Sequence, residues 1–520
     1  MAYSQADSWT GELRQPSANL LLGIVFVIAT AGLIYELVMA AVASYVLGDS
    51  VRQFSLVIGT YLSALGMGAY ASRFIGRDLE VKFIDVELSA ALIGGFSAPA
   101  LFLAYSYTPS FSLYLFGTVI LVGTLVGLEL PLLVRILERQ FELKELIART
   151  LSVDYLGALI GSLTFSLFLF PQLGLVQSSL VCGLLNAAVA LASTWVLNGD
   201  PKAMVRARLR SVVVIALLAT GIGFGGRFSE LSEAPLYNGE VLVAKQSAYQ
   251  RIVVTETAGH ISLFLNGKLQ FAGVDESIYH EALVHPAMAS TAVPKRILIG
   301  GGGDGLAVRE LLRWPEVESI TLVDLDPAMT DLAQNFGPLQ QLNEAALSDP
   351  RVTVQNADAF IFLAEYKGAP FDVMIFDFPD PSSYGLGKLY SMSFYRRAAK
   401  HLAPNGSLAV QSSSPYYAPK AFWCVVKTLE DSGFNARPYH AFVPSFGEWG
   451  YVLAKPNSFR PFRSLDSAPG RKDLTDEKLA LLFSFPEDMK PRVTRANRLN
   501  NQVLVSYYES EWGLPPVTTY

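Results

Sequence analysis

The sequence predicts an α-helical multi-pass membrane domain followed by a small β region and an α/β doubly wound domain. Three observations lead to this prediction. Seven apolar segments follow one another before about residue 227, each near the length that spans a bilayer. Short alternating strands begin near Glu240. From Arg296 onward, buried strands alternate with helical segments, as in a parallel sheet covered by helices.

Composition supports the membrane prediction and excludes several classes. Of 520 residues, 51% are hydrophobic and 17% charged, which is more apolar than ordinary soluble proteins. A net charge of -6 without basic runs argues against nucleic acid as a partner. Cys182 and Cys424 are the only cysteines, so we expect no disulfide framework and no metal site. The first apolar segment is too long for a cleaved signal.

The chain is expected to divide into four regions. These are a transmembrane helical domain, a linker with a small β-strand domain, a Rossmann-like nucleoside-binding domain and a C-terminal extension, at 1–227, 228–295, 296–456 and 457–520. We expect the membrane spans at 19–47, 54–76, 84–106, 111–137, 151–171, 174–197 and 211–227. The last region holds apolar runs that favour an ordered extension.

Basic residues are distributed unevenly between the loops that join these segments. One set of loops carries Arg73, Arg77, Lys82, Arg135, Arg139, Lys144, Arg149, Lys202, Arg206, Arg208 and Arg210, whereas the opposite set carries only Arg52. By the positive-inside rule, the basic loops and the N-terminus are cytoplasmic. We therefore expect a multi-pass protein of the cell membrane, in contact with the lipid bilayer.

Three carboxylates fall inside apolar segments. Glu36, Glu129 and Asp154 either hydrogen-bond between helices or bind a cation, and the sequence leaves both interpretations open. Several glycines in these segments are expected to let helices approach closely, namely Gly66, Gly68, Gly157 and Gly161.

The β region and the doubly wound domain follow in order. Three strands, VLVA, RIVVTET and ISLFLNGKLQF, contain a hairpin turn at Asn266-Gly267. The later strands are ITLVDLD, VTVQNAD, FDVMIFD and SLAVQSS, with helices from Pro327, Ala359, about Met392 and Pro419, and a closing strand pair near 436–443 and 449–455.

The stretch from Arg296 to Glu310, RILIGGGGDGLAVRE, predicts a strand, a glycine turn and a helix. Its spacing also fits the G-x-G-x-x-G pattern of dinucleotide enzymes. Asp304 would repel a pyrophosphate in this turn, but a carboxylate suits a cationic sulfonium nucleoside with an amine tail. We therefore favour an S-adenosylmethionine-type ligand over NAD.

Acidic residues end or follow the strands after this turn. Asp324 is placed to accept hydrogen bonds from ribose hydroxyls, whereas a helix N-cap role fits Asp326 better. Asp358, followed by Ala359, either binds the adenine amino group or caps a helix. Asp377 and Asp380 flank Pro379, and two carboxylates facing one cavity suit a cation or a proton to be transferred.

These motifs together resemble the spermidine synthases, the polyamine aminopropyltransferases. GGGDG at 301–305 with Arg309-Glu310 is similar to the family's GGGDGG-x-x-RE motif. The resemblance covers roughly 240–456 and includes SAYQRIVV (247–254), LNGKLQF (265–271), DESIYHE (275–281), His285-Pro286, VDLD, NADAF and DFPDP.

The resemblance implies transfer of the aminopropyl group of decarboxylated S-adenosylmethionine to an amine, with putrescine as the first expectation and methylthioadenosine as the second product. Asp377 with Tyr279 would orient and deprotonate the amine, and Asp304 would hold the aminopropyl nitrogen. The remaining cofactor positions would be Gln250, Gln270, Gly301, Gly303, Asp324, Asp358 and Ala359. The amine would contact His280, Asp380, Phe446 and Trp449.

The sequence also departs from the family pattern on the amine side. DPSSYGLGKLYS replaces the usual continuation of D-x-x-D-P, Gln411-Ser412-Ser413 replaces a Q-x-E element, and Phe446 replaces a tyrosine. Each departure removes polar contact with the amine. Two alternatives therefore stay open: an S-adenosylmethionine-type transferase acting on another, lipophilic amine, and a polyamine-binding sensor or transporter. The oligomeric state also stays open, with a homo-oligomer among the options.

Seven spans would place the soluble half outside the cell, away from a nucleoside made in the cytosol. The seventh segment, Val212 to Gly226, has about sixteen uncharged residues, or roughly 24 Å of helix, against a hydrocarbon core of roughly 30 Å. We expect this segment to lie flat or re-enter, and the soluble domain to be cytoplasmic.

Overall fold

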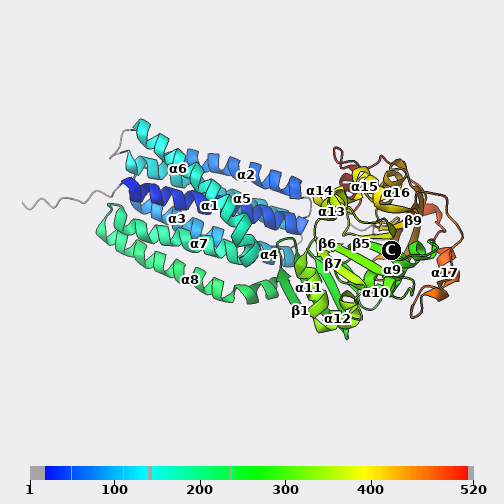
Figure 1. The fold of residues 1–520 in the computed structure, drawn as a ribbon. Coiled ribbons are helices and arrows are strands. Elements are labelled where there is room, and N and C mark those ends of the chain that lie inside the picture. Colours follow the sequence, from blue (N-terminus) through cyan, green and yellow to red (C-terminus); the bar gives the residue numbers. More distant parts are fainter. Residues whose placement is uncertain are drawn as a thin grey trace, which may run out of the picture. The chain divides into compact units, whose positions relative to one another are not determined.

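The computed structural model describes residues 18–47, 50–108, 110–138, 143–233, 237 and 239–512. The chain forms two compact units, Met1–Pro235 and Leu236–Tyr520, here called the helical unit and the α/β unit (Figure 1). The predicted transmembrane region falls within the helical unit. The predicted nucleoside-binding domain and C-terminal extension fall within the α/β unit.

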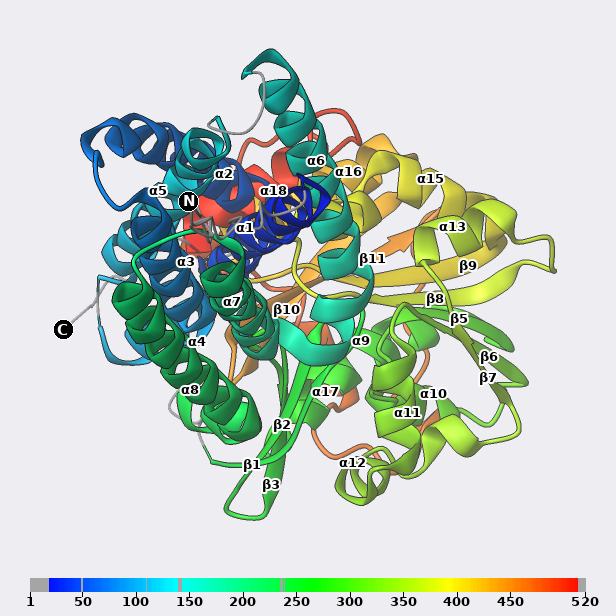
Figure 2. The ribbon, with the colours of Figure 1, turned by 90° about the vertical axis from the view of Figure 1, so that its left-hand side faces the viewer.

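Helices make up the described part of the helical unit, and they pack side by side (Figure 2). They are α1 (Ala18–Leu47), α2 (Ser50–Ala71), α3 (Leu79–Gly95), α4 (Ser97–Tyr107), α5 (Phe111–Leu137), α6 (Leu143–Thr164), α7 (Phe170–Val196) and α8 (Pro201–Glu233). Among the described residues, five helical stretches are long and apolar enough to cross a membrane, or six when the bent pair α3 and α4 counts as one. The apolar segments predicted from the sequence are therefore helical.

Three of these segments differ from the prediction in shape. The third was expected to be continuous, but its helix breaks at Phe96 and bends by 40° between α3 and α4. The fifth and sixth form one helical stretch, Lys144–Val196, with a π-helical turn at Phe165–Leu169 and a break at Gly174. Gly174 has a φ of 70°, which no residue inside an α-helix adopts, so the stretch consists of two helices.

The seventh segment is longer than predicted. Helix α8 has 33 residues, and its part Pro201–Phe224 is long and apolar enough to cross a membrane. The predicted length was too short because the basic residues before Val212 were taken as a boundary, whereas they lie within the helix. Their charges are accommodated: Arg210 pairs with Asp85 at 2.6 Å, and Arg208 donates to the carbonyl oxygen of Thr194 at 3.0 Å.

Close helix approaches confirm three of the four predicted glycines. A Cβ atom on Gly68 would lie 2.1 Å from the Thr124 carbonyl oxygen. On Gly157 and Gly161 it would lie 2.6 Å and 2.7 Å from backbone carbonyl oxygens of α1. The prediction for Gly66 is wrong, because nothing lies within 4 Å of its Cβ position.

The α/β unit begins with a four-stranded antiparallel sheet in the order β1-β2-β3-β4. Its strands are β1 (Glu240–Gln246), β2 (Arg251–Thr257), β3 (His260–Leu265) and β4 (Lys268–Ala272). The predicted hairpin turn is confirmed, because Leu265 pairs with Lys268 and the φ angles of Asn266 and Gly267 are 50° and 77°.

A seven-stranded sheet in the order β10-β11-β9-β8-β5-β6-β7 follows. Its strands are β5 (Arg296–Gly301), β6 (Ser319–Asp324), β7 (Val352–Asn356), β8 (Phe371–Asp377), β9 (Leu402–Gln411), β10 (Asn435–Val443) and β11 (Gly447–Lys455). Strands β5 to β9 are parallel, and β11 is antiparallel to both of its neighbours. The doubly wound parallel sheet with a closing strand pair is thus confirmed.

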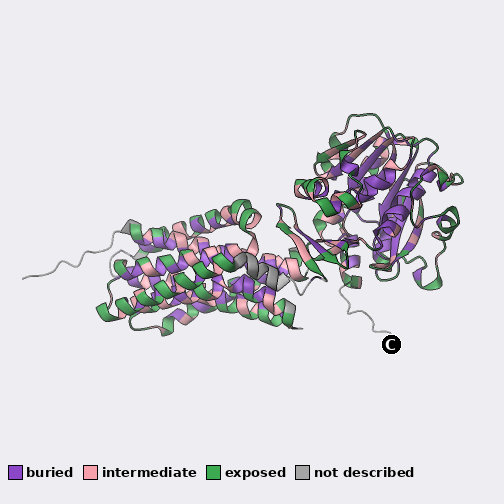
Figure 3. Cartoon of the chain, turned by 90° about the horizontal axis from the view of Figure 1, so that it is seen from below, coloured by how far each residue is buried: buried purple, intermediate pink, exposed green. Residues whose placement is uncertain are grey.

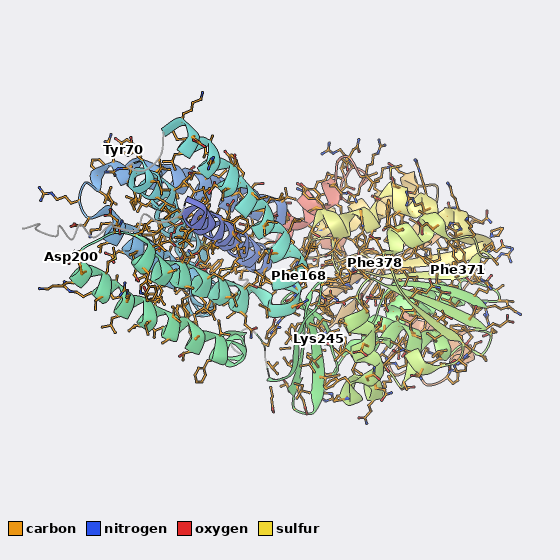
Figure 4. All side chains as sticks on the ribbon, turned by 60° about the vertical axis from the view of Figure 1, so that its left-hand side comes forward. Tyr70, Phe168, Asp200, Lys245, Phe371 and Phe378 are labelled. Carbon is orange, nitrogen blue, oxygen red and sulfur yellow. The ribbon has the colours of Figure 1, made fainter. Side chains whose placement is uncertain are left out.

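Helices cover both faces of this sheet. They are α9 (Glu276–Ala289), α10 (Leu306–Leu312), α11 (Pro327–Asn335), α12 (Gly337–Leu342), α13 (Ala359–Glu365), α14 (Tyr384–Gly387), α15 (Met392–His401) and α16 (Pro419–Asp431). Alternate residues of β5 enter two different hydrophobic clusters: Ile297 and Ile299 join α9 and α10, whereas Leu298 joins α13, α15 and α16. Figure 3 shows this buried interior, and Figure 4 labels Phe371 at the start of β8 and Phe378 directly after its end.

The described part of the C-terminal extension, residues 457–512, packs as an ordered segment. It contains α17 (Asp476–Leu481) and α18 (Val503–Trp512). The backbone N–H of Asn497 donates to Thr428 Oγ1 at 2.8 Å, and Glu511 accepts from the backbone N–H groups at the start of α16. These contacts fix the extension against the sheet domain.

The close approach of α2 and α5 leads to a stability prediction. In Gly127→Ala, the new Cβ atom would lie 2.3 Å from the Leu65 carbonyl oxygen, so the backbones must separate. We expect the free energy of unfolding of the detergent-solubilised full chain to fall by about 1–3 kcal/mol. Gly117→Ala on the same helix is the control, since its Cβ position is open. Equal melting temperatures for the two variants would contradict this packing.

Candidate active site

The glycine turn between β5 and α10 forms the centre of the site. Gly301 and Gly302 have φ angles of 78° and 66°. A Cβ atom on Gly301 would lie 2.2 Å from the Asp377 carbonyl oxygen, and one on Gly303 would lie 2.7 Å from Asp324 Oδ2. Glycine is therefore required at positions 301 and 303, because the turn packs directly onto the ends of β8 and β6.

Asp304 lies buried within this turn. Its Oδ1 accepts from the backbone N–H of Leu306 at 2.8 Å, and its carbonyl oxygen accepts from Asn343 Nδ2 at 2.8 Å. Burial raises the pKa of the Asp304 carboxyl, whereas the charge of His280 lowers it. The carboxylate thus helps to start α10 and still has Oδ2 for a ligand.

Asp324 ends β6 directly beside the turn. Its two carboxylate oxygens accept from the backbone N–H groups of Gly303 at 3.1 Å and Asp326 at 2.9 Å. Burial raises the pKa of Asp324 to about 6, and the charges of Asp304 and Asp326 add to this rise. Three carboxylates held this close together favour a cationic ligand.

Asp326 is the N-cap of α11, as the sequence predicted. Its Oδ1 accepts from the backbone N–H of Ala328 at 3.0 Å. Its Oδ2 accepts from Ser247 Oγ at 2.7 Å and from Gln250 Nε2 at 3.0 Å. Gln250 therefore joins the β region to the ribose side of the turn.

The residues that the resemblance assigns to adenine have structural partners. Asp358 is the N-cap of α13, accepting from the backbone N–H of Phe360 at 2.8 Å, and it also pairs with Lys388. The N-cap interpretation of Asp358 is confirmed, whereas its contact with adenine stays a prediction. The contact of the buried Ala359 with the nucleoside also stays a prediction. Gln270 Nε2 donates to the carbonyl oxygens of Lys268 and Leu269 on its own strand, at 3.1 and 3.3 Å.

Helix α9 positions the residues opposite the turn. Its carboxylates bind three separate parts of the unit. Asp275 accepts from Ser445 in the β10–β11 hairpin, Glu276 binds Arg309 of α10, and Glu281 accepts from backbone N–H groups of 472–474. The sequence analysis did not predict this helix, whose Pro286 argues against an uninterrupted helical pattern.

A buried chain of charges runs from α9 into α10. Arg309 donates to both oxygens of Glu276, at 3.0 and 2.9 Å, and through Nε to Glu310 at 2.8 Å. Glu310 in turn contacts His285 Nε2 at 3.1 Å. The Arg309-Glu310 part of the motif is therefore structural: it ties α10 to α9 inside the protein.

A short hydrogen bond joins Tyr279 and Asp377. Tyr279 OH donates to Asp377 Oδ1 at 2.6 Å. Burial and the Asp377 charge raise the pKa of Tyr279, so the hydroxyl stays protonated. Burial, together with the charge of Asp304, raises the pKa of Asp377 to about 6. The charge of His280 and the hydrogen bond from Tyr279 lower this pKa and so limit the rise.

His280 supplies a positive charge to this site. Its Nδ1 lies 2.8 Å from the Glu276 carbonyl oxygen and 3.0 Å from Glu276 Oε2. Burial lowers the pKa of the imidazole, but Glu276, Asp304 and Asp377 together raise it to about 9. An imidazolium therefore faces the two aspartates at neutral pH.

Asp380 lies on the amine side, among residues from three elements. It accepts from Gln411 Nε2 at 3.4 Å and from Ser413 Oγ at 3.2 Å. Burial raises the pKa of Asp380, and the charge of Lys268 lowers it. Gln411 and Ser413 thus hold Asp380, although the sequence suggested that these positions had lost polar contact.

Aromatic rings form the neighbouring wall. The ring centroids of Phe446 and Trp449 are 5.0 Å apart, and those of Tyr279 and Phe446 are 6.0 Å apart. Tyr279, His280, Asp304, Asp324 and Asp377 come together, and Phe446 joins them. Asp358, which pairs with Lys388, follows β7, the strand next to β6.

Comparison with known proteins identifies the family. The Spermine/spermidine synthase domain matches residues 276–461. A polyamine aminopropyltransferase of Leptospira interrogans is 46% identical over 491 residues, covering 94% of this chain and 98% of that protein. The chain belongs to the polyamine aminopropyltransferase family. Polyamine aminopropyltransferase 2 of Ralstonia nicotianae is also 46% identical, covering 95% and 98%.

These alignments extend over the helical unit as well as the α/β unit, so both belong to the shared aminopropyltransferase chain. A crystal structure of a spermidine synthase in complex with the transition state analogue AdoDATO is 26% identical. It covers 53% of this chain and 89% of its own, with a TM-score of 0.45. The resemblance seen in the sequence motifs is confirmed at the level of the family, and the protein is an aminopropyltransferase.

Sequence reasoning missed several residues around the site of this aminopropyltransferase. Glu276, Lys268 and Lys388 were quoted within motifs but not assigned a role, and neither was Tyr508. Lys268 Nζ lies 3.4 Å from Tyr508 OH, and both act on Asp380. Periodicity gives no sign of such contacts, because Tyr508 is far away in the chain. Among the described residues, no cluster of His, Cys, Asp and Glu could hold a metal.

The charge of His280 leads to a pH prediction. Asp377 must be ionised to accept a proton, so kcat/KM should rise with pH through about 6. In His280→Gln the cation that lowers the pKa of Asp377 is lost, and this limb should move to higher pH by on the order of one unit. His440→Gln, which removes a separate His–Glu pair on β10, is the control. An unshifted limb in His280→Gln would show that His280 does not act on the base.

Proposed function

We propose that this aminopropyltransferase moves the aminopropyl group of decarboxylated S-adenosylmethionine to putrescine and releases methylthioadenosine. The observation that carries the proposal is the Tyr279–Asp377 hydrogen bond of 2.6 Å next to the carboxylate of Asp304. A proton acceptor and a carboxylate for a cationic nucleoside lie at one edge of the sheet. This arrangement favours turnover over binding alone.

The nucleoside would lie along the glycine turn. Asp324 would accept the ribose hydroxyls, and Asp304 would pair with the ammonium of the aminopropyl group. The Gln250–Asp326 contact and the Asp358 N-cap border this region, the latter at the adenine end. The positive sulfonium and ammonium would offset the mutual repulsion of the buried carboxylates.

The amine would attack in line with the breaking C–S bond. Its nitrogen forms a bond to the terminal methylene carbon of the aminopropyl group, and the bonding pair of the C–S bond returns to sulfur, which becomes a neutral thioether. The proton lost from the amine passes to Asp377. Tyr279, held by Asp377, would keep the nitrogen in place for the attack.

The raised pKa of Asp377 assists the proton transfer. An alkylammonium has a pKa of about 10, so it exceeds that of an ordinary aspartate by about six units. With the pKa of Asp377 at about 6, the gap narrows to about four units. Since each unit corresponds to about 1.4 kcal/mol, burial reduces the free energy of deprotonation by about 3 kcal/mol.

A diamine fits the second carboxylate. Asp377 and Asp380 are three residues apart on either side of Pro379, so one end of a diamine would meet the base while the other meets Asp380. Phe446 and Trp449 would cover the methylenes between them. Lys268 and Tyr508 act on Asp380 and would limit the length of the acceptor at this end.

Asp304→Asn tests the nucleoside assignment. Asparagine keeps the Oδ1 acceptor that holds Leu306, so the turn should be preserved. The variant should bind decarboxylated S-adenosylmethionine about ten- to a hundredfold more weakly, because a charge-assisted hydrogen bond contributes roughly 1.5–3 kcal/mol. Methylthioadenosine, which lacks the ammonium, serves as the matched ligand and should lose little affinity in calorimetric titrations. Equal losses would mean that Asp304 only shapes the turn.

We further propose that the helical unit is embedded in the cell membrane. Its helices are long and apolar, and many of their large side chains are exposed, such as Leu62, Leu113 and Leu167 at 57%, 74% and 62%. An exposed apolar surface of this kind suits lipid rather than water. Figure 4 shows Tyr70 and Asp200 at one end of this unit and Phe168 at the other. The basic segments adjoin Tyr70 and Asp200, which supports one cytoplasmic end.

For the α/β unit we propose the cytoplasmic side, where the nucleoside is made. This proposal requires that α8 does not carry the chain fully across the bilayer. At 33 residues, or about 50 Å, α8 is long enough to do so. The shortness of the seventh segment therefore no longer supports the cytoplasmic assignment, which rests on the supply of the co-substrate.

Labelling with an impermeant thiol reagent on intact cells decides the side. Ser458→Cys places a thiol on an exposed position of the α/β unit, and the native Cys182 and Cys424 are buried. We expect Ser458→Cys to be labelled only after permeabilisation. Lys202→Cys, on a basic segment, is the control that should behave in the same way. Tyr107→Cys, on the opposite loop, should react without permeabilisation. If Ser458→Cys reacts with intact cells, the α/β unit is external and the cytoplasmic proposal is wrong.

A further inference from the structure

Four polar side chains from four helices are buried in the helical unit without partners. They are Tyr35 of α1, Glu87 of α3, Glu129 of α5 and Asn186 of α7, and each is at most 1% exposed. Among the described residues, no hydrogen-bond partner exists for the Tyr35 hydroxyl, any carboxylate oxygen of Glu87 and Glu129, or either amide atom of Asn186. Buried polar atoms are nearly always paired in folded proteins, so these seven atoms require an explanation.

The first three side chains lie close together. Both carboxylates act electrostatically on the Tyr35 hydroxyl, and Glu87 acts on Glu129. The Tyr35 ring also packs against α3, since a Cβ atom on Gly94 would lie 2.8 Å from it. Glu87 was not singled out from the sequence, although it is as buried as the predicted Glu129.

Helix packing brings Asn186 to the level of Glu87. Gly183 lies against the Ala91 carbonyl oxygen and the Gly95 Cα atom, and Gly95 also lies near the Ser179 carbonyl oxygen. This order shows that α3 and α7 run antiparallel. One turn beyond these contacts, Glu87 on α3 and Asn186 on α7 come to the same level, and both side chains are buried.

The charges of this cluster require compensation. A buried carboxylate without a counter-charge is destabilising by several kcal/mol. No Lys, Arg or His is among the groups that act on Glu87 or Glu129 in the described chain. The described residues also form no cluster suited to a metal ion. Protons or a bound cation must therefore neutralise the two carboxylates.

We propose that Tyr35, Glu87, Glu129 and Asn186 form a second binding site for the primary ammonium group of a diamine or polyamine, separate from the transfer site. A primary ammonium has three N–H donors and one positive charge. The two carboxylates and the Asn186 carbonyl oxygen supply matching acceptors. Amines of this class are the substrates and products of the aminopropyltransferase activity, and only the choice of amine rests on that activity.

Binding of labelled spermidine to the purified full chain, measured by equilibrium dialysis, tests the proposal. The wild type should bind spermidine at two kinds of site. In Glu87→Gln and in Glu129→Gln, the affinity of the site in the helical unit for spermidine should fall about ten- to a hundredfold. Transfer activity should be kept in both variants. Tyr35→Phe keeps the ring packing and should weaken binding less. The control Glu145→Gln removes an exposed carboxylate paired with Arg149 and should change nothing.

Wild-type stoichiometry and affinity in both glutamine variants would overturn the proposal. Infrared spectroscopy of the unaltered protein provides a second test that does not depend on how the variants fold. If an ammonium binds, adding spermidine should convert protonated carboxyl bands to ionised carboxylate bands. A protonated signal that spermidine leaves unaltered would mean that protons alone neutralise the pair. Transfer activity is measured separately, so loss of this site is distinguishable from failure of the transfer mechanism.

Discussion

The two-pronged ion pair between Glu276 and Arg309 is the constraint on which the active site depends. It joins the first turn of α9 to α10, the helix that begins at the glycine turn. Because Glu276 also holds His280, the same contact sets the position of the imidazolium, and α9 carries Tyr279 toward Asp377. Removing one partner of such a buried pair leaves an uncompensated charge, typically at a loss of 3–5 kcal/mol.

Electrostatics connect this framework to the chemistry. Asp304 is buried and Asp324 and Asp377 are half-buried, and the loss of solvent raises the pKa of each. His280 opposes this rise at Asp304 and Asp377 and thereby keeps a base available. A cationic nucleoside and a cationic amine would both relieve the repulsion among these groups. The charge of this site therefore suits cationic ligands.

Local patterns predicted much of this structure. The strands, the glycine turn and the Asp326 cap were predicted because each depends on residues close together in the chain. Helix α9 was missed because its Pro286 interrupts the helical pattern. The contact between Lys268 and Tyr508 was missed because it joins distant segments of the chain. The length of α8 was wrong because basic residues were taken to end a helix that continues through them. Side-chain pairing across the fold is invisible to periodicity.

The central claim concerns which group is transferred and to what. The most direct measurement is mass spectrometry of products after the purified full chain is incubated with decarboxylated S-adenosylmethionine, or with S-adenosylmethionine, and a panel of amines. The mechanism predicts that putrescine gains one aminopropyl group and that methylthioadenosine appears in equal amount, with the decarboxylated nucleoside only. A methylated amine formed from S-adenosylmethionine, without methylthioadenosine, would contradict it.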